Sequence, residues 1–139
     1  MTVQIPEGFE PCTLVDAYSS LTGPFYQKGP LTDAVFGLAL GERHGNLNGV
    51  IHGGALFTFA DSFMGMHLEA HAKRLTATIT LNVDFVSGMA AEGWIEGRAR
   101  LVRLARTVAF LKGEITCGDK VLMTADGVWR VFDEPSPRV

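Results

Sequence analysis

The chain has few cysteines, no excess of positive charge and no long unbroken apolar run. Cys12 and Cys117 lie far apart without metal-ligand spacing, which favours a reducing cytosol over a disulfide framework. The net charge of −3 makes nucleic acid an unexpected partner. No segment is long enough to span a membrane, and residues 1–6 lack the basic and apolar parts of a signal peptide. We therefore expect a cytoplasmic protein without a nucleic-acid or membrane partner.

The length of 139 residues and the hydrophobic content of 47% predict one domain over residues 1–139, with enough chain to enclose a core. Frequent Pro and Gly between Pro6 and Pro30 indicate loops, with one short helix between Cys12 and Ser20. Residues 1–33 are therefore expected to form an irregular N-terminal extension.

The segment from Gly54 to His71 predicts a long helix that is apolar on nearly all sides, and such helices are buried. Its polar exceptions, Thr58, Asp61 and Ser62, share one narrow stripe because they lie three and four residues apart. A carboxylate in such surroundings needs hydrogen bonds or a charged partner, which makes Asp61 a candidate functional acid. The structural alternative is that Asp61 only caps or pairs with a neighbouring segment.

Strands are predicted before and after this helix. Ala34 to Glu42 is apolar enough for a first strand. From Thr76 to Phe85 polar and apolar residues alternate, which predicts a strand with one polar and one apolar face. Three more strands are predicted at Trp94 to Val102, Thr107 to Thr116 and Val121 to Phe132, with a tight turn at Gly118-Asp119. The pattern indicates an α+β architecture in which one antiparallel sheet curls around the helix.

The helix is preceded by the run Asn46-Leu47-Asn48-Gly49-Val50-Ile51-His52-Gly53-Gly54. Two glycines let the backbone approach a ligand closely, and the first N–H groups of a helix carry a partial positive charge. Such a helix start suits a carbonyl oxygen that becomes negative, as in acyl transfer.

The segment from Asn46 to Asp61, NLNGVIHGGALFTFAD, resembles the signature of hotdog-fold acyl-CoA thioesterases of the phenylacetate-pathway (PaaI-like) type. The similar features are an Asn six residues before the His, the His-Gly-Gly sequence, and an Asp nine residues after the His. The likeness extends from about Phe36 to Phe132. It implies a hotdog fold and hydrolysis of an acyl-CoA thioester without a cofactor.

The resemblance also implies a role for each matching residue. The Gly53 N–H would bind the thioester carbonyl oxygen, while Asp61 would activate the attacking water or act as the nucleophile. Asn46 and His52 would position the substrate, and Thr78 would hold the water. The alternatives are that Asn46 only serves turn geometry, that His52 only fixes its loop, and that Thr78 is an ordinary strand residue.

A geometric argument predicts an oligomer independently of the family. Gly53 and Asp61 lie eight residues apart, so they stand about 12 Å apart along one helix axis. One reacting carbonyl cannot contact both groups. A two-fold axis that pairs Gly53 of one chain with Asp61 of another would create two shared sites. Members of the family commonly form such homodimers or dimers of dimers.

Further residues are predicted to bind the substrate. Arg98, Arg100, Arg103 and Arg106 form a basic cluster suited to the phosphates of coenzyme A, with Arg106 and Arg103 as the preferred candidates and a solvated strand face as the alternative. Phe57 would line an acyl pocket, although such aromatics are more often core. Gly54 would contact the substrate or, alternatively, allow close packing at the helix start.

Other chemistries fit the sequence poorly. His67 and His71 lie one helical turn apart, but a third ligand and the HExxH order are missing, so no metal is expected. A Ser-His-Asp hydrolase is not expected because GxSxG is absent. Two other functions remain open, a hotdog hydratase or dehydratase that uses His52 with Asp61, and a non-catalytic acyl-CoA binding module. The buried carboxylate argues against a pure binding module.

Overall fold

The computed structural model of the protein describes residues 3–13 and 16–138. In chain order, its elements are β1 (Glu10–Pro11), α1 (Ala17–Thr22), β2 (Phe25–Lys28), η1 (Leu31–Asp33), β3 (Val35–Leu40), η2 (Glu42–His44), α2 (Gly53–Ala72), β4 (Arg74–Phe85), β5 (Gly93–Leu104), β6 (Val108–Cys117) and β7 (Lys120–Pro135).

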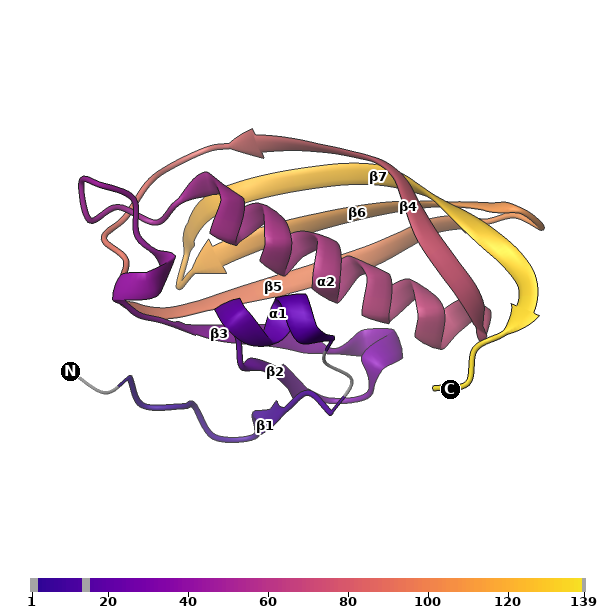
Figure 1. Ribbon diagram of the computed structural model, residues 1–139, viewed down its shortest axis with the longest axis horizontal. Coiled ribbons are helices and arrows are strands. Elements are labelled where there is room, and N and C mark those ends of the chain that lie inside the picture. Colours follow the sequence, from indigo (N-terminus) through magenta and orange to yellow (C-terminus); the bar gives the residue numbers. More distant parts are fainter. Residues whose placement is uncertain (1–2, 14–15, 139) are drawn as a thin grey trace.

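The strands form one antiparallel sheet in the order β1-β2-β3-β5-β6-β7-β4, and the long helix α2 lies along its concave side (Figure 1). This confirms the predicted α+β hotdog architecture. The hairpin turn at Gly118-Asp119 is also found, since Cys117 pairs with Lys120 across it. One pairing joins strands that are far apart in the sequence: β4 pairs with β7, and β4 forms one edge of the sheet.

Helix α2 buries one side against the sheet. The buried residues are Leu56, Phe59, Ala60, Phe63, Met64, His67 and Leu68. The expectation that the helix is buried on nearly all sides is wrong for the single chain, because Phe57 is 38% exposed and Asp61 is only half-buried. The apolar residues of α2 exceed what the sheet of one chain covers. Within the described residues, no helix is both long and apolar enough to cross a membrane.

Two strand glycines let α2 pack closely on the sheet. A Cβ added at Gly97 would lie 2.3 Å from the Phe63 ring, and one added at Gly113 would lie 2.8 Å from the Met64 sulfur. Both glycines therefore make room for large helix side chains, whose burial contributes much of the core.

Strand β4 differs from its predicted alternation. Its register with β7 shifts between Thr78 and Thr80, which marks a β-bulge at Ile79. Before the bulge Thr78 faces the helix, whereas beyond it Leu81 and Val83 pack against the core. The expectation of one polar and one apolar face along the whole strand is therefore wrong, because the bulge exchanges the two faces.

The N-terminal segment is more regular than predicted. Phe25–Lys28, expected to be a loop, is strand β2, and it pairs antiparallel with β3. The expected short helix is α1, shifted to Ala17–Thr22, while residues 14–15 of its predicted range lie outside the described residues. The burial of Phe25 in the core explains why this segment is held in the sheet.

Gly97→Ala should lower the free energy of unfolding by about 1–3 kcal/mol, because the added methyl overlaps the Phe63 ring. Urea denaturation measures the difference. Gly65→Ala is the matched control, since a Cβ there meets nothing within 4 Å and alanine favours a helix by up to about 1 kcal/mol. Equal stability of the two variants would contradict this account of the packing.

Candidate active site

The loop that enters α2 is organised by Asn46. Its side-chain oxygen accepts hydrogen bonds from the backbone N–H groups of Asn48, at 2.9 Å, and Val50, at 3.2 Å. Gly49 adopts a φ of 74°, a left-handed conformation that glycine allows without strain. The structure thus gives the side-chain oxygen of Asn46 a turn-forming role, and Asn46 itself is exposed.

His52 caps the N-terminus of α2. Its Nδ1 accepts a hydrogen bond of 2.8 Å from the Gly54 N–H, so the neutral ring carries its proton on Nε2. A Cβ at Gly54 would lie 2.9 Å from this Nδ1, which explains the second glycine of the pair. Gly54 therefore makes room for the cap, and its N–H is occupied by the histidine.

The Gly53 N–H is the group at this helix start that the cap does not engage. Gly53 is the first residue of α2, where a backbone N–H has no acceptor within the helix. A Cβ at Gly53 would lie 3.1 Å from the Phe85 ring, so the glycine also lets β4 close against the helix. Both residues line a cavity of about 480 Å³.

Asp61 lies two turns farther along α2 and faces β4. The Thr78 hydroxyl donates a hydrogen bond of 2.7 Å to its Oδ1, which leaves the second carboxylate oxygen for another partner. Both residues line a second cavity, of about 580 Å³, together with Thr76 and Ser62. The β-bulge at Ile79 creates this pairing by keeping Thr78 on the helix side of the strand.

The far end of this second cavity contains two charged residues that the sequence analysis missed. Glu69 and Arg138 line it and form a salt bridge of 2.6 Å. Glu69 follows Asp61 and Gly65 at four-residue intervals, so the helical spacing was a usable signal. Arg138 gave no signal, because only the fold brings the C-terminal segment to α2.

The structure brings Asp61 together with Thr78, and His52 caps the helix start next to Gly53, but within one chain Gly53 and Asp61 line separate cavities. Eight helical residues separate Gly53 from Asp61, which corresponds to about 12 Å along the axis.

The remaining candidates lie away from the Asp61 cavity. Arg103 and Arg106 are exposed, at the end of β5 and in the turn after it, and neither lines that cavity. The Arg106 carbonyl accepts a hydrogen bond from the guanidinium of Arg74. Arg98 is engaged by Glu96 at 3.0 Å. Phe57 lies on α2 midway between Gly53 and Asp61.

The other titratable groups near α2 have structural partners. His67 bonds to the Leu31 carbonyl and His71 to the Thr32 carbonyl, so both histidines hold η1 against the helix. Burial, followed by the nearby His71, lowers the pKa of His67 and keeps it neutral. Burial raises the pKa of Cys12 to about 11, so at neutral pH this thiol is protonated and a poor nucleophile.

Residues 48–124 match the thioesterase superfamily, and this match covers more than half of the chain. The chain belongs to the thioesterase superfamily. The matched segment contains the cap, the Gly53 amide, Asp61 and Thr78. Membership makes the protein a hydrolase whose general reaction is acyl thioester hydrolysis.

Individual relatives support the assignment. A Pseudomonas aeruginosa protein named as an esterase is 29% identical over 132 residues, which cover 93% of this thioesterase and 98% of the relative. A Ralstonia eutropha JMP134 structure, named as a thioesterase related to phenylacetic acid degradation, is 25% identical with a TM-score of 0.76, covering 86% and 92% of the two chains. The PaaI-like resemblance is therefore confirmed.

A Streptococcus pneumoniae TIGR4 protein, named as a thioesterase and solved with coenzyme A, shares the fold. It is 18% identical, with a TM-score of 0.74 and coverage of 81% of this thioesterase and 88% of the other chain.

Substitutions at His52 separate capping from substrate contact. His52→Ala should lower the free energy of unfolding by about 1 kcal/mol, because it removes the cap, whereas His52→Ser should retain most of the stability, since serine is a good N-cap. Urea denaturation measures both. If His52 acts only as a cap, His52→Ser also keeps thioester hydrolysis. If His52→Ser keeps its stability but loses thioester hydrolysis, the imidazole contacts the substrate.

Proposed function

We propose that this thioesterase hydrolyses an acyl-CoA thioester to the free acid and coenzyme A, without a cofactor. The observation that carries the proposal is the Asp61 carboxylate of the largely apolar helix α2, which lines a cavity and accepts a hydrogen bond from Thr78. A pure binding pocket for an acyl chain has little use for such a group.

The proposed reaction begins with a water bound to the second carboxylate oxygen of Asp61, the one that Thr78 leaves free. Asp61 accepts a proton from this water while the water oxygen bonds to the carbonyl carbon. The Gly53 N–H stabilises the negative charge that develops on the carbonyl oxygen. The carbonyl then re-forms, the C–S bond breaks, and the leaving thiolate takes up the proton that Asp61 accepted.

Coenzyme A is the proposed thiol part of the substrate. The coenzyme A complex of the Streptococcus pneumoniae protein, which has the same fold, supports this choice. Arg103 and Arg106 are exposed guanidinium groups outside the Asp61 cavity, so they are available for the phosphates while the acyl group lies inside. Asn46 and His52 belong to the loop that enters α2 at Gly53 and are proposed to position the carbonyl.

The proposal requires two chains at each site, because Gly53 and Asp61 of one chain are about 12 Å apart. Strand β4 is an edge strand, and Ile79 and Phe85 on it are 58% and 56% exposed. Such an edge is suited to pairing with a second copy. A two-fold axis there would place the half-exposed sides of both α2 helices together, with Gly53 of one chain opposite Asp61 of the other.

Asp61→Asn should lower kcat for thiol release from acyl-CoA by roughly 100-fold or more, because the base is lost while the shape is kept. The measurement is free-thiol release from a panel of short aliphatic, aromatic and long-chain acyl-CoA esters.

Asp16→Asn is the matched control for this experiment. Asp16 is a carboxylate of the same cavity, it caps α1, and asparagine is an equally good cap. Hydration of an unsaturated acyl-CoA without thiol release, or tight binding without either product, would contradict the proposed reaction.

The shared site also predicts the position of Phe57. Residue 57 lies midway between residues 53 and 61, so in antiparallel helices it faces its own copy. Phe57→Cys in a Cys117→Ser background should therefore form a disulfide-linked dimer under mild oxidation, as seen on a non-reducing gel. Ala70→Cys, about 20 Å away along α2, is the control. Equal cross-linking of both variants, or none at residue 57, would contradict the arrangement.

A further inference from the structure

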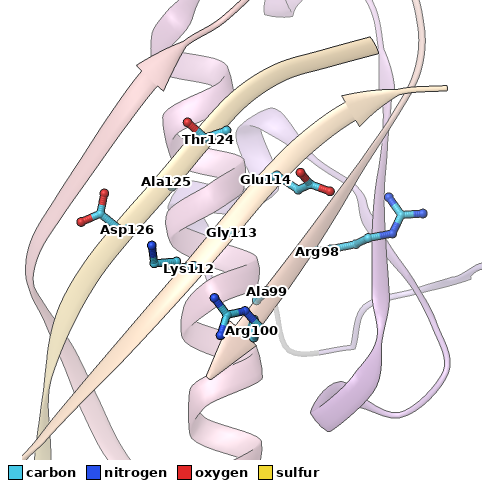
Figure 2. A pocket seen from close by; sticks show the side chains of 9 residues that line it. All are labelled: Arg98, Ala99, Arg100, Lys112, Gly113, Glu114, Thr124, Ala125 and Asp126. Carbon is cyan, nitrogen blue, oxygen red and sulfur yellow. The ribbon is translucent and has the colours of Figure 1, made fainter. Parts of the chain in front are cut away.

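Gly65 is a glycine in the middle of α2 that the packing of the single chain does not require. Glycine destabilises the interior of a helix relative to alanine, unless its small size is needed for packing. Gly113 meets such a need: it lies on β6 where this strand crosses in front of α2 (Figure 2), and a Cβ there would lie 2.8 Å from the Met64 sulfur. Apart from its own helical turns, no atom of the described residues lies within 4 Å of a Cβ built at Gly65. The missing side chain of Gly65 therefore leaves open space.

This open space belongs to the cavity that contains Asp61. Gly65 lines the cavity, which has a volume of about 580 Å³, together with Asp61 and Glu69 of the same helix. The three residues share one face of α2 because they follow one another at intervals of four. At a rise of about 1.5 Å per residue, Gly65 lies about 6 Å from Asp61 along the axis, and Glu69 lies about 12 Å from it. The cavity therefore extends along α2 from the proposed catalytic carboxylate past Gly65.

Apolar side chains form part of the wall of this cavity. Leu31, Met66 and Trp129 line it, and Trp129 is only 1% exposed. Trp129 pairs with Thr78 in the register of β7 and β4, and side chains of paired residues lie on the same face of a sheet. A large apolar surface therefore lies beside the hydroxyl that binds Asp61. This wall suits an apolar group attached to a carbonyl at Asp61.

The wall becomes charged at the level of Glu69. The Glu69 carboxylate forms a salt bridge of 2.6 Å with Arg138 and accepts a hydrogen bond from the Ser136 hydroxyl. Both partners belong to the C-terminal segment, which lies against the last turns of α2. An apolar chain gains little from contact with a charged pair. The space over Gly65 is therefore the part of the cavity, between Asp61 and this charge, that an apolar chain can use.

We propose that Gly65 determines which acyl groups this thioesterase accepts, because the acyl chain passes through the space that a side chain at residue 65 would fill. The inference rests on the proposed function, since it places the reacting carbonyl at Asp61. With carbon–carbon bonds of about 1.5 Å, an extended butanoyl chain reaches about 4 Å beyond the carbonyl carbon and an octanoyl chain about 9 Å. Only the octanoyl chain reaches Gly65, about 6 Å from Asp61 along the axis. The preferred substrates are therefore acyl groups long enough to pass Gly65.

Substitutions at Gly65 test the inference. The measured quantity is the ratio of kcat/KM for octanoyl-CoA to kcat/KM for butanoyl-CoA, both from thiol release. Gly65→Leu should lower this ratio roughly tenfold or more, because one methylene group in an apolar pocket already changes discrimination by about 10-fold to 200-fold. Gly65→Ala should lower the ratio by a smaller factor. If Gly65→Leu does not fold, Gly65→Ala carries the test, since alanine favours a helix and meets no obstacle there.

Ala70→Leu is the matched control, since it adds a similar side chain to the same helix. Residue 70 lies five positions beyond Gly65, on a different side of α2, and it does not line the Asp61 cavity. Ala70→Leu should leave the ratio unchanged. Urea denaturation should show that Gly65→Ala is at least as stable as the wild type, and sedimentation velocity should show that both Gly65 variants keep the wild-type mass.

The inference is overturned if the Gly65 variants change thiol release from both esters by the same factor or not at all, because Gly65 then does not select the acyl group. It is also overturned if a Gly65 variant has a lower mass than the wild type, because the space over Gly65 would then receive a second copy of the chain. Failure of the proposed function gives a different result, in which the wild type releases no thiol from either ester.

Discussion

The hydrogen bond between Thr78 and Asp61 is the contact on which the candidate site depends. A carboxylate on a largely apolar helix needs a donor, and only a neighbouring strand can supply one from this side. In a regular strand Thr78 would share its face with Thr80 and not with Leu81. The bulge at Ile79 lets one strand give a hydroxyl to Asp61 and then bury Leu81 and Val83. An edge strand tolerates such a bulge because it has one neighbouring strand, so hydrogen bonds are disturbed on one side only.

The long elements were predictable from the sequence, and their pairing was not. Apolar content located α2 and the last three strands, because each apolar segment extends over about ten residues or more. The bulge was missed because Thr76 to Phe85 alternates without a visible break. Strand β2 was missed because Phe25–Lys28 is short and lies between Gly-Pro pairs. The neighbour of β4 is β7, a non-local choice that local periodicity does not encode.

In the candidate site too, some residues were predictable from the sequence and most of their contacts were not. The helix start and Asp61 were predictable because glycines and a lone acid stand out against apolar neighbours. From the residues alone, partners were predictable only where they were local, as with His52 two residues from Gly54, and the distant Thr78 was named only through the family resemblance. The Asn46 oxygen serves the turn through contacts within four residues, which favours the structural alternative for that atom. Arg138 reaches Glu69 only because the C-terminal segment folds back to α2, so no sequence pattern predicts this salt bridge.

Helix α2 and strand β4 expose apolar side chains on the same side of the chain. Asp61 contacts Thr78, and Gly53 lies against Phe85, so the half-exposed side of the helix runs along the exposed edge strand. A partner at this edge would satisfy backbone groups and apolar side chains, which salt affects little. One contact at this edge would therefore cover the exposed apolar side chains of the helix and of the strand together.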